Sequence, residues 1–180
     1  MRYEEWVRRG GAITLRNPDP TLNTIHVPVT VRTIPALCSD GKAKVFNTFA
    51  LIDTGATVSA IDSGVAKSLG LIPISKARVN GVHGSSTVDM FSFNMDIGDS
   101  LHINVSMATE GQFSTSEFKI LIGMDILRLG EMYLGQEEKD GKCVGTIFSF
   151  SIPATGDSID YVEMLNKARQ SKMKELSNKN

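Results

Sequence analysis

The sequence has few of the residues that bind metal ions or form covalent cross-links. It contains two cysteines and three histidines in 180 residues, and Cys38 and Cys143 lie far apart, without the CxxC spacing of a zinc site. We therefore expect both thiols to be free and buried, and we expect no metal site and no cofactor.

Charge excess and long apolar runs are also lacking. The formal net charge is -1, so no strong positive field is available to hold a nucleic-acid backbone. No stretch approaches the roughly 20 apolar residues that cross a bilayer, and the charged N-terminus lacks the apolar core of a signal peptide. These features predict a cytoplasmic protein that binds neither nucleic acid nor membrane.

What the sequence does have is alternation with a period of two, which indicates β-strands. Apolar residues alternate over 25–31, 91–97 and 101–107, ending with Val31, Ile97 and Met107 respectively. Each pattern predicts a half-buried strand. Pro28 lies in the first of them and cannot donate to a β-ladder, so we expect that strand at a sheet edge. The protein is predicted to be mainly β.

Helix signals are few. Asp62 or Ser63 can cap a short helix that ends at Gly70, and a second short helix is predicted over 124–129. Beyond residue 157, apolar residues recur at three-residue steps, which predicts a C-terminal amphipathic helix. The length suits one domain. We predict an N-terminal extension over 1–20, one domain over 21–153, and the helix with a polar tail over 154–180.

The most informative segment is an apolar strand that runs straight into Asp53, Thr54, Gly55 and Ala56. The sheet would hold such a carboxylate at the end of a strand, where it can face a cleft. Gly55 frees the backbone to turn and allows a second copy of the loop to approach closely. The same tripeptide also occurs as an ordinary turn, so its flanking residues matter.

With those flanks, the segment LIDTGATVS over 51–59 resembles the active-site signature of the retropepsin-like aspartic proteases. A second segment, ILIGMDIL over 120–127, resembles the second signature of that family. The resemblance covers roughly residues 22–150. It implies an acid protease fold: a small closed β-barrel that forms one lobe per chain, with short helices.

The resemblance also implies roles for individual residues. Asp53, Thr54 and Gly55 would form the catalytic loop, and a hairpin over 78–88 would form a mobile flap over the substrate. The substrate-binding residues implied in this way are Ala56, Val82, His83, Gly84 and Ile122. A plain hairpin is the alternative interpretation of the flap, and His83 is expected to be an exposed residue at its tip.

Aspartic proteolysis needs two carboxyl groups that share one proton, and this sequence offers one Asp-Thr-Gly. The other acids have different settings: Asp62 is expected to cap a helix, Asp96 and Asp99 flank a turn, and Asp125 is expected to cap its own helix. We therefore expect a homodimer, in which each subunit supplies one Asp53. The predicted function is an aspartic endopeptidase acting on a polypeptide substrate.

Two alternatives remain at this stage. The domain could be a catalytically silent module for dimerisation or peptide binding, or a structural or capsid-associated protein with an incidental motif. The C-terminal part leaves another choice open. In viral members of the family the terminal strands of both subunits interleave, so residues 143–152 would either join a dimer interface or pack on their own subunit.

Overall fold

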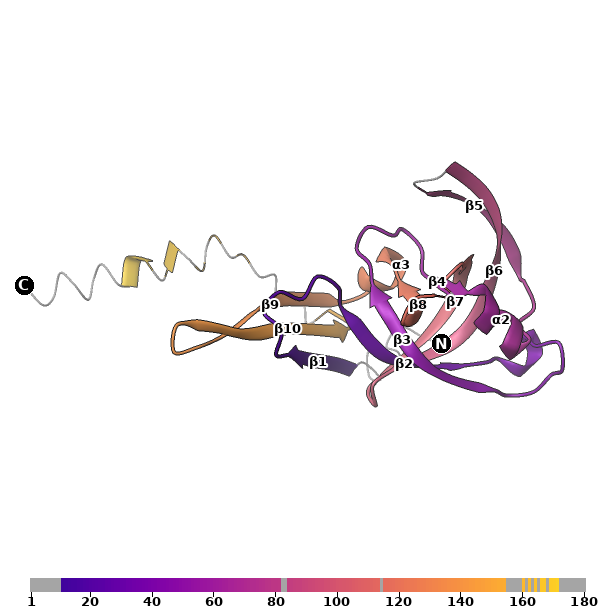
Figure 1. The fold of residues 1–180 in the computed structure, drawn as a ribbon, viewed down its shortest axis with the longest axis horizontal. Coiled ribbons are helices and arrows are strands. Elements are labelled where there is room, and N and C mark those ends of the chain that lie inside the picture. Colours follow the sequence, from indigo (N-terminus) through magenta and orange to yellow (C-terminus); the bar gives the residue numbers. More distant parts are fainter. Residues whose placement is uncertain are drawn as a thin grey trace, which may run out of the picture.

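The computed structural model describes residues 11–81, 84–113, 115–154, 160, 162, 164, 166, 167 and 169–171. Strands dominate, in two sheets that lie side by side (Figure 1). The elements in chain order are β1 (Gly11–Asn17), β2 (His26–Arg32), η1 (Pro35–Leu37), β3 (Val45–Ile52), β4 (Ala60–Asp62), α2 (Ser63–Leu69), β5 (Ser75–Gly81), β6 (Gly84–Ile97), β7 (Leu101–Gly111), β8 (Phe118–Ile122), α3 (Met124–Leu127), β9 (Glu131–Lys139) and β10 (Lys142–Ile152).

The larger sheet closes into a six-stranded barrel. Its strands follow the order β2-β3-β8-β4-β7-β6, and β6 pairs again with β2. The predicted alternation in β2 is confirmed, because Val27, Val29 and Val31 are all buried. The prediction that this strand lies at an edge is wrong. Pairing with β6 begins at Val29, so Pro28 stands just outside the part of β2 that needs donors on both sides.

Strands β6 and β7 form the long antiparallel wall of the barrel. Phe93, Met95 and Ile97 are buried as predicted. Met107 was expected to face the core, but it is 54% exposed. The reason is a β-bulge: Phe91 pairs with Ala108 and Phe93 with Val105, so β7 carries an extra residue and its alternation changes phase.

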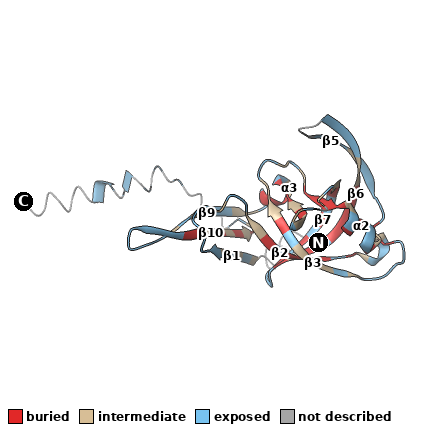
Figure 2. Ribbon diagram, in the orientation of Figure 1, coloured by how far each residue is buried: buried red, intermediate tan, exposed pale blue. Residues whose placement is uncertain are grey.

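The smaller sheet has the order β1-β10-β9 and extends away from the barrel (Figure 1). A turn with positive φ at Asp140 and Gly141 connects β9 to β10. Phe148 and Phe150 are buried in the same core as the barrel strands. Figure 2 shows buried residues where the sheet meets the barrel and exposed residues at the far end of the hairpin. Strand β10 thus pairs with β1 and β9 of its own chain.

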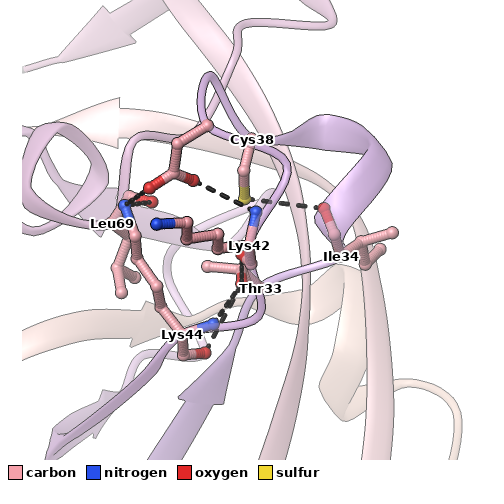
Figure 3. A network of polar contacts seen from close by, with 7 residues as sticks. Thr33, Ile34, Cys38, Lys42, Lys44 and Leu69 are labelled. Carbon is pink, nitrogen blue, oxygen red and sulfur yellow. Dashed lines mark hydrogen bonds and ion pairs between the residues drawn. The ribbon is translucent and has the colours of Figure 1, made fainter.

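The predicted short helices are present. Asp62 is the N-cap of α2, which ends at Gly70 in the left-handed conformation, φ 69°. A polar network ties the loop before β3 to this end of α2 (Figure 3). In it the Lys44 Nζ donates to the Leu69 carbonyl at 3.1 Å and pairs with Asp40 at 3.0 Å. The cation thereby satisfies a carbonyl at the C-terminus of the helix.

The ends of the chain are described only in part. Strand β1, inside the predicted extension, pairs along its whole length with β10. Beyond residue 160, the described residues from 162 to 171 are helical, as predicted for this region.

No helix within the described residues is both long and apolar enough to span a membrane. Both cysteines are free, but Cys143 is exposed and not buried as expected, because it lies near the end of the β9–β10 hairpin.

Candidate active site

The loop after β3 carries Asp53 and is anchored by backbone hydrogen bonds. The Asp53 N–H donates to the Ile122 carbonyl at 3.0 Å, and the Ala56 N–H donates to the Asp53 carbonyl at 3.3 Å. The Gly55 N–H donates to the Asp53 carboxylate at 2.8 Å. The side chain is half-buried. Strand and loop together thus fix a carboxylate at the end of β3 while leaving part of it open.

Parallel pairing of β3 with β8 brings the second signature against the first. Ile52 is opposite Ile122, and Gly123, which follows it, lies against Ala56 and Val58 of the Asp53 loop. A side chain at Gly123 would place its Cβ 2.8 Å from the Val58 carbonyl carbon and 2.9 Å from the Ala56 oxygen. Only glycine allows this close approach. Two segments that are distant in the sequence therefore form one packed unit.

Ser59 and Asp125 connect these two segments. The Asp125 carboxylate accepts from the Ser59 N–H at 2.9 Å and from the Ser59 hydroxyl at 2.7 Å. The hydroxyl in turn accepts from the Gly123 N–H at 3.0 Å. Ser59 is 1% exposed, so these bonds hold the loop from inside the protein.

The prediction that Asp125 caps its own helix is therefore wrong. Helix α3 has Gly123 as its N-cap and no side-chain cap bond. The N–H of Met124 already donates to the Ala56 carbonyl at 2.8 Å, so the carboxylate is available for Ser59. The sequence showed that Asp125 starts a helix, but it gave no signal for this contact between distant segments.

Asp62 begins a second acid–hydroxyl–glycine sequence, Asp62-Ser63-Gly64, and the structure gives it a different role. It is 3% exposed. One carboxylate oxygen accepts from the N–H groups of Gly64 and Val65, and the other accepts from the Phe113 N–H at 2.8 Å. Asp62 is thus a buried helix cap, as expected, and it presents no carboxylate to a cleft.

The predicted flap is a β-hairpin formed by β5 and β6, which rises from the barrel (Figure 1). Gly81 pairs with Gly84 at its described end, and Gly84 has φ 118°, a value that L side chains rarely adopt. Two other predicted substrate-binding residues, Val82 and His83, lie outside the described residues. Ala77, Val79 and Val88 are half-buried, while Arg78 and Asn80 between them are exposed. One face of the hairpin is therefore more apolar than the other.

The remaining predicted site residues fall into two groups. Thr54, Gly55 and Ala56 share the loop with Asp53, and Thr54 and Gly55 are exposed. Ile122 is fully buried, so its contribution is the carbonyl that holds Asp53 and not a side chain offered to a substrate. Its neighbour Leu121 is half-buried and pairs with Leu51 beside the loop. Alternation in ILI places Ile120 and Ile122 toward the core and Leu121 on the opposite face.

No group of His, Cys, Asp and Glu within the described residues is arranged to hold a metal ion. A cluster of charged residues lies on the outer wall of the barrel. Asp96 accepts from His102 at 2.7 Å and from Arg32 at 2.5 Å. Burial acts to raise the pKa of Asp96, but these hydrogen bonds and the charge of Arg32 outweigh burial and hold it below its ordinary value of 3.8.

Comparisons with known proteins agree with the two signatures. Residues 41–129 match the family model described as "gag-polyprotein putative aspartyl protease". No curated protein matches the sequence. Among solved structures, the chain is similar to the protease of simian foamy virus (mac), with 12% identity, a TM-score of 0.39, and coverage of 58% of this chain and 92% of that one. It is also similar to a retropepsin-like aspartic protease from Rickettsia conorii, with 15% identity, a TM-score of 0.45, and coverage of 79% and 94% respectively.

The family match spans both signatures, Asp53-Thr54-Gly55 and the segment around Gly123, and the closed barrel brings them into contact. These observations assign residues 41–129 to the retropepsin-like aspartic proteases.

Proposed function

We propose that this protein is an aspartic endopeptidase that cleaves a polypeptide substrate as a homodimer. The observation that carries the proposal is the setting of Asp53: a half-buried carboxylate at the end of a strand, on a loop braced by the second signature. Thr54 and Gly55 are exposed beside it, where a second copy of the same loop can contact them. The chemistry uses no metal and no covalent intermediate.

A second copy is needed because one carboxylate cannot act as both acid and base. The only other acid in an acid–hydroxyl–glycine order, Asp62, is buried and fully used as a cap. In a two-fold dimer, a residue near the axis meets its own copy, so two Asp53 side chains can share one proton. The missing half of the site would thus come from the partner.

The reaction then proceeds by acid–base catalysis. The ionised carboxyl takes a proton from a water molecule, whose oxygen attacks the scissile carbonyl. The protonated carboxyl gives its proton to the carbonyl oxygen as the tetrahedral intermediate forms. When the intermediate collapses, the C–N bond breaks, the leaving nitrogen receives the proton that the dyad took from water, and a hydroxyl of the intermediate returns a proton to the dyad. The dyad returns to its starting state with one proton.

Exposed apolar residues on the smaller sheet are consistent with a partner chain. Met132, Tyr133 and Leu134 follow one another on β9 and are 43%, 41% and 55% exposed. Consecutive residues point to opposite faces of a strand, so both faces of β9 are uncovered here. Strand β9 also lies at the edge of its sheet in the described structure. Uncovered apolar edge strands are the kind of surface that another chain covers.

The variant Asp53→Asn tests the catalytic role. We expect it to reduce peptide hydrolysis by roughly a thousandfold, because an amide cannot accept the proton from water. Its amide oxygen can still accept from the Gly55 N–H, so the free energy of unfolding should change by less than about 1 kcal/mol. Hydrolysis of a peptide library and urea unfolding measure the two effects.

The matched control is Asp99→Asn, which changes an exposed acid in the turn between β6 and β7. It should leave both hydrolysis and stability unchanged. Hydrolysis by the Asp53 variant at the wild-type rate would contradict the assignment. If the wild-type protein binds peptides or a pepstatin-type inhibitor without turning over any peptide, the domain is a silent binding module.

A further inference from the structure

A groove borders the end of the loop that carries Asp53 and has no part in the chemistry proposed above. It encloses about 490 Å³ and is lined by the end of the catalytic loop, by α3 and the residues after it, and by β7. Thr57 and Val58 of the loop form part of its wall. Met90, at the base of the flap on β6, forms another part. The groove therefore touches both the loop that carries Asp53 and the hairpin proposed to cover the substrate.

The lining of the groove is apolar and open to solvent. Met107, Met124 and Leu129 are 54%, 39% and 43% exposed. Methionine side chains are flexible and polarisable, so they adapt to apolar groups of different shape. Apolar side chains gathered in a concave surface with a few polar groups are typical of a binding site.

The fold itself produces this exposure. The extra residue in β7 shifts the alternation of that strand, so that Ala108 enters the core and Met107 turns outward. A regular strand would have placed the larger side chain inside. Bulges that redirect a side chain are frequent near functional sites.

Arg128 supplies the groove with a positive charge. It lines the groove and is exposed. None of the ion pairs between described residues involves it. Asp125 lines the groove as well, and its Oδ1 accepts two hydrogen bonds from Ser59. An exposed guanidinium beside an apolar surface favours a ligand that has an acidic group next to an apolar one.

We propose that this groove binds a large apolar side chain of the polypeptide substrate, away from the scissile bond, and that Arg128 selects an acidic residue next to it. The proposal rests on the proposed function, since it assumes that a peptide lies across Asp53. Met107, Met124 and Leu129 are then specificity-determining residues, and Arg128 determines the preferred charge.

The short distance between Asp53 and the groove supports a substrate side chain as the bound group. Val58 lies five positions after Asp53 in the sequence, and a fully extended segment of five residues spans at most about 17 Å. An extended substrate covers the same distance with about five of its own residues. The apolar side chain bound in the groove should therefore belong to a position within about five residues of the cleaved bond.

The test combines cleavage with binding. Wild-type protein is given peptide libraries randomised at each position on both sides of the bond, and the dissociation constants of selected peptides are measured on the inactive Asp53→Asn protein by fluorescence anisotropy. We expect a preference for Leu, Met or Phe at one position within that range. Met107→Thr and Leu129→Gln should weaken binding of the preferred peptide about tenfold and leave binding of its serine-substituted counterpart unchanged.

Two further variants test the charge and the location. Arg128→Glu should change the preferred neighbour from acidic to basic, and Arg128→Lys should keep the acidic preference. Val45→Thr is the control for location. Val45 is 55% exposed, as Met107 is 54% exposed, but it lies on β3 and does not line the groove. This variant should change neither measurement. In cleavage assays, the groove variants should raise KM and leave kcat unaltered.

The outcomes separate this inference from the proposed function. If wild type cleaves peptides but the groove variants keep its preferences, the groove is not a subsite and the inference is wrong. If no peptide is cleaved, yet the Asp53→Asn protein binds apolar peptides in a way that depends on Met107 and Leu129, the groove is a peptide site and the catalytic proposal fails. Equal binding of all peptides by all variants contradicts the inference.

Discussion

Ser59 receives and donates hydrogen bonds that join the two signatures of the site. Its hydroxyl donates to Asp125 and accepts from the Gly123 N–H, and both contacts are shielded from water. A buried donor that loses its acceptor costs the free energy of its lost hydration. The stability of the loop that carries Asp53 should therefore depend on this single hydroxyl.

The variant Ser59→Ala tests this dependence. It leaves the Gly123 N–H without its acceptor, so we expect the free energy of unfolding to fall by about 1–3 kcal/mol. Urea unfolding measures the change. Ser75→Ala, an exposed serine at the start of β5, is the control and should have almost no effect. Equal stability of wild type and Ser59→Ala would mean that the contact does not brace the loop.

Asp96, on the outer wall of the barrel, should make the stability of the fold depend on pH. Its pKa lies below the ordinary value of 3.8 in the folded protein, so its ionised form stabilises the fold above that value. This contribution is lost as the pH falls through the lower, folded-state pKa. Wild type should therefore lose stability below about pH 4. Asp96→Asn should be less stable near neutral pH and should lose less on acidification.

Urea unfolding at a series of pH values between neutral and strongly acidic measures both parts of this prediction. Asp140→Asn is a suitable control, because Asp140 lies in an exposed turn at φ 52°, a conformation that asparagine tolerates. It should follow the wild-type curve. Parallel curves for wild type and Asp96→Asn would contradict a stabilising role of the ionised Asp96.

At the scale of elements, alternation in the sequence predicted the strands well where the ladder is regular. In β2 and β6 the apolar residues face the core as expected. The prediction failed at Met107, because a bulge is decided by how β7 fits against β6 and leaves no trace in the pattern of either strand. It also failed for the edge position of β2, since closure of a barrel joins strands that are far apart in the sequence.

The same distinction applies to the candidate site. Local chemistry predicted the Asp53 loop, the Asp62 cap and the short helix at Met124, because each depends on neighbouring residues. The contact of Asp125 with Ser59 depends on the parallel pairing of β3 and β8, which local patterns do not reveal. Ile122 was predicted to contact substrate, but its side chain is buried on the core face of β8.

The flap offers a test at this scale. Gly84 begins β6 with φ 118°, so Gly84→Ala should distort the end of the hairpin. If this hairpin covers the substrate, we expect kcat/KM to fall about tenfold, because closure completes the site. Gly41→Ala is the control, since Gly41 also has positive φ and open space around it but lies in the loop before β3.

Both variants place an alanine at a positive φ, 118° in Gly84→Ala and 65° in Gly41→Ala, so both should lose some stability. Only the change in the flap should affect peptide hydrolysis. If Gly84→Ala and Gly41→Ala lowered kcat/KM equally, the loss would reflect general destabilisation, and the hairpin would have no lid function.

On the scale of the whole molecule, the barrel and the smaller sheet have separate roles. The barrel positions the Asp53 loop against the second signature, and the two sheets share one hydrophobic core. The smaller sheet places β10 between β1 and β9, so the C-terminal strand has no free edge in the described structure. Strand β9 has the exposed apolar residues that suit contact with a second copy.

The central claim is that two copies of Asp53 form one catalytic pair. Mixing wild type with Asp53→Asn at constant total concentration, after exchange of subunits, tests it most directly. If each active unit needs one Asp53 from each chain, hydrolysis should fall with the square of the wild-type fraction, to about a quarter at an equal mixture. A linear fall, to about half, would show that each chain acts alone and would contradict the shared site.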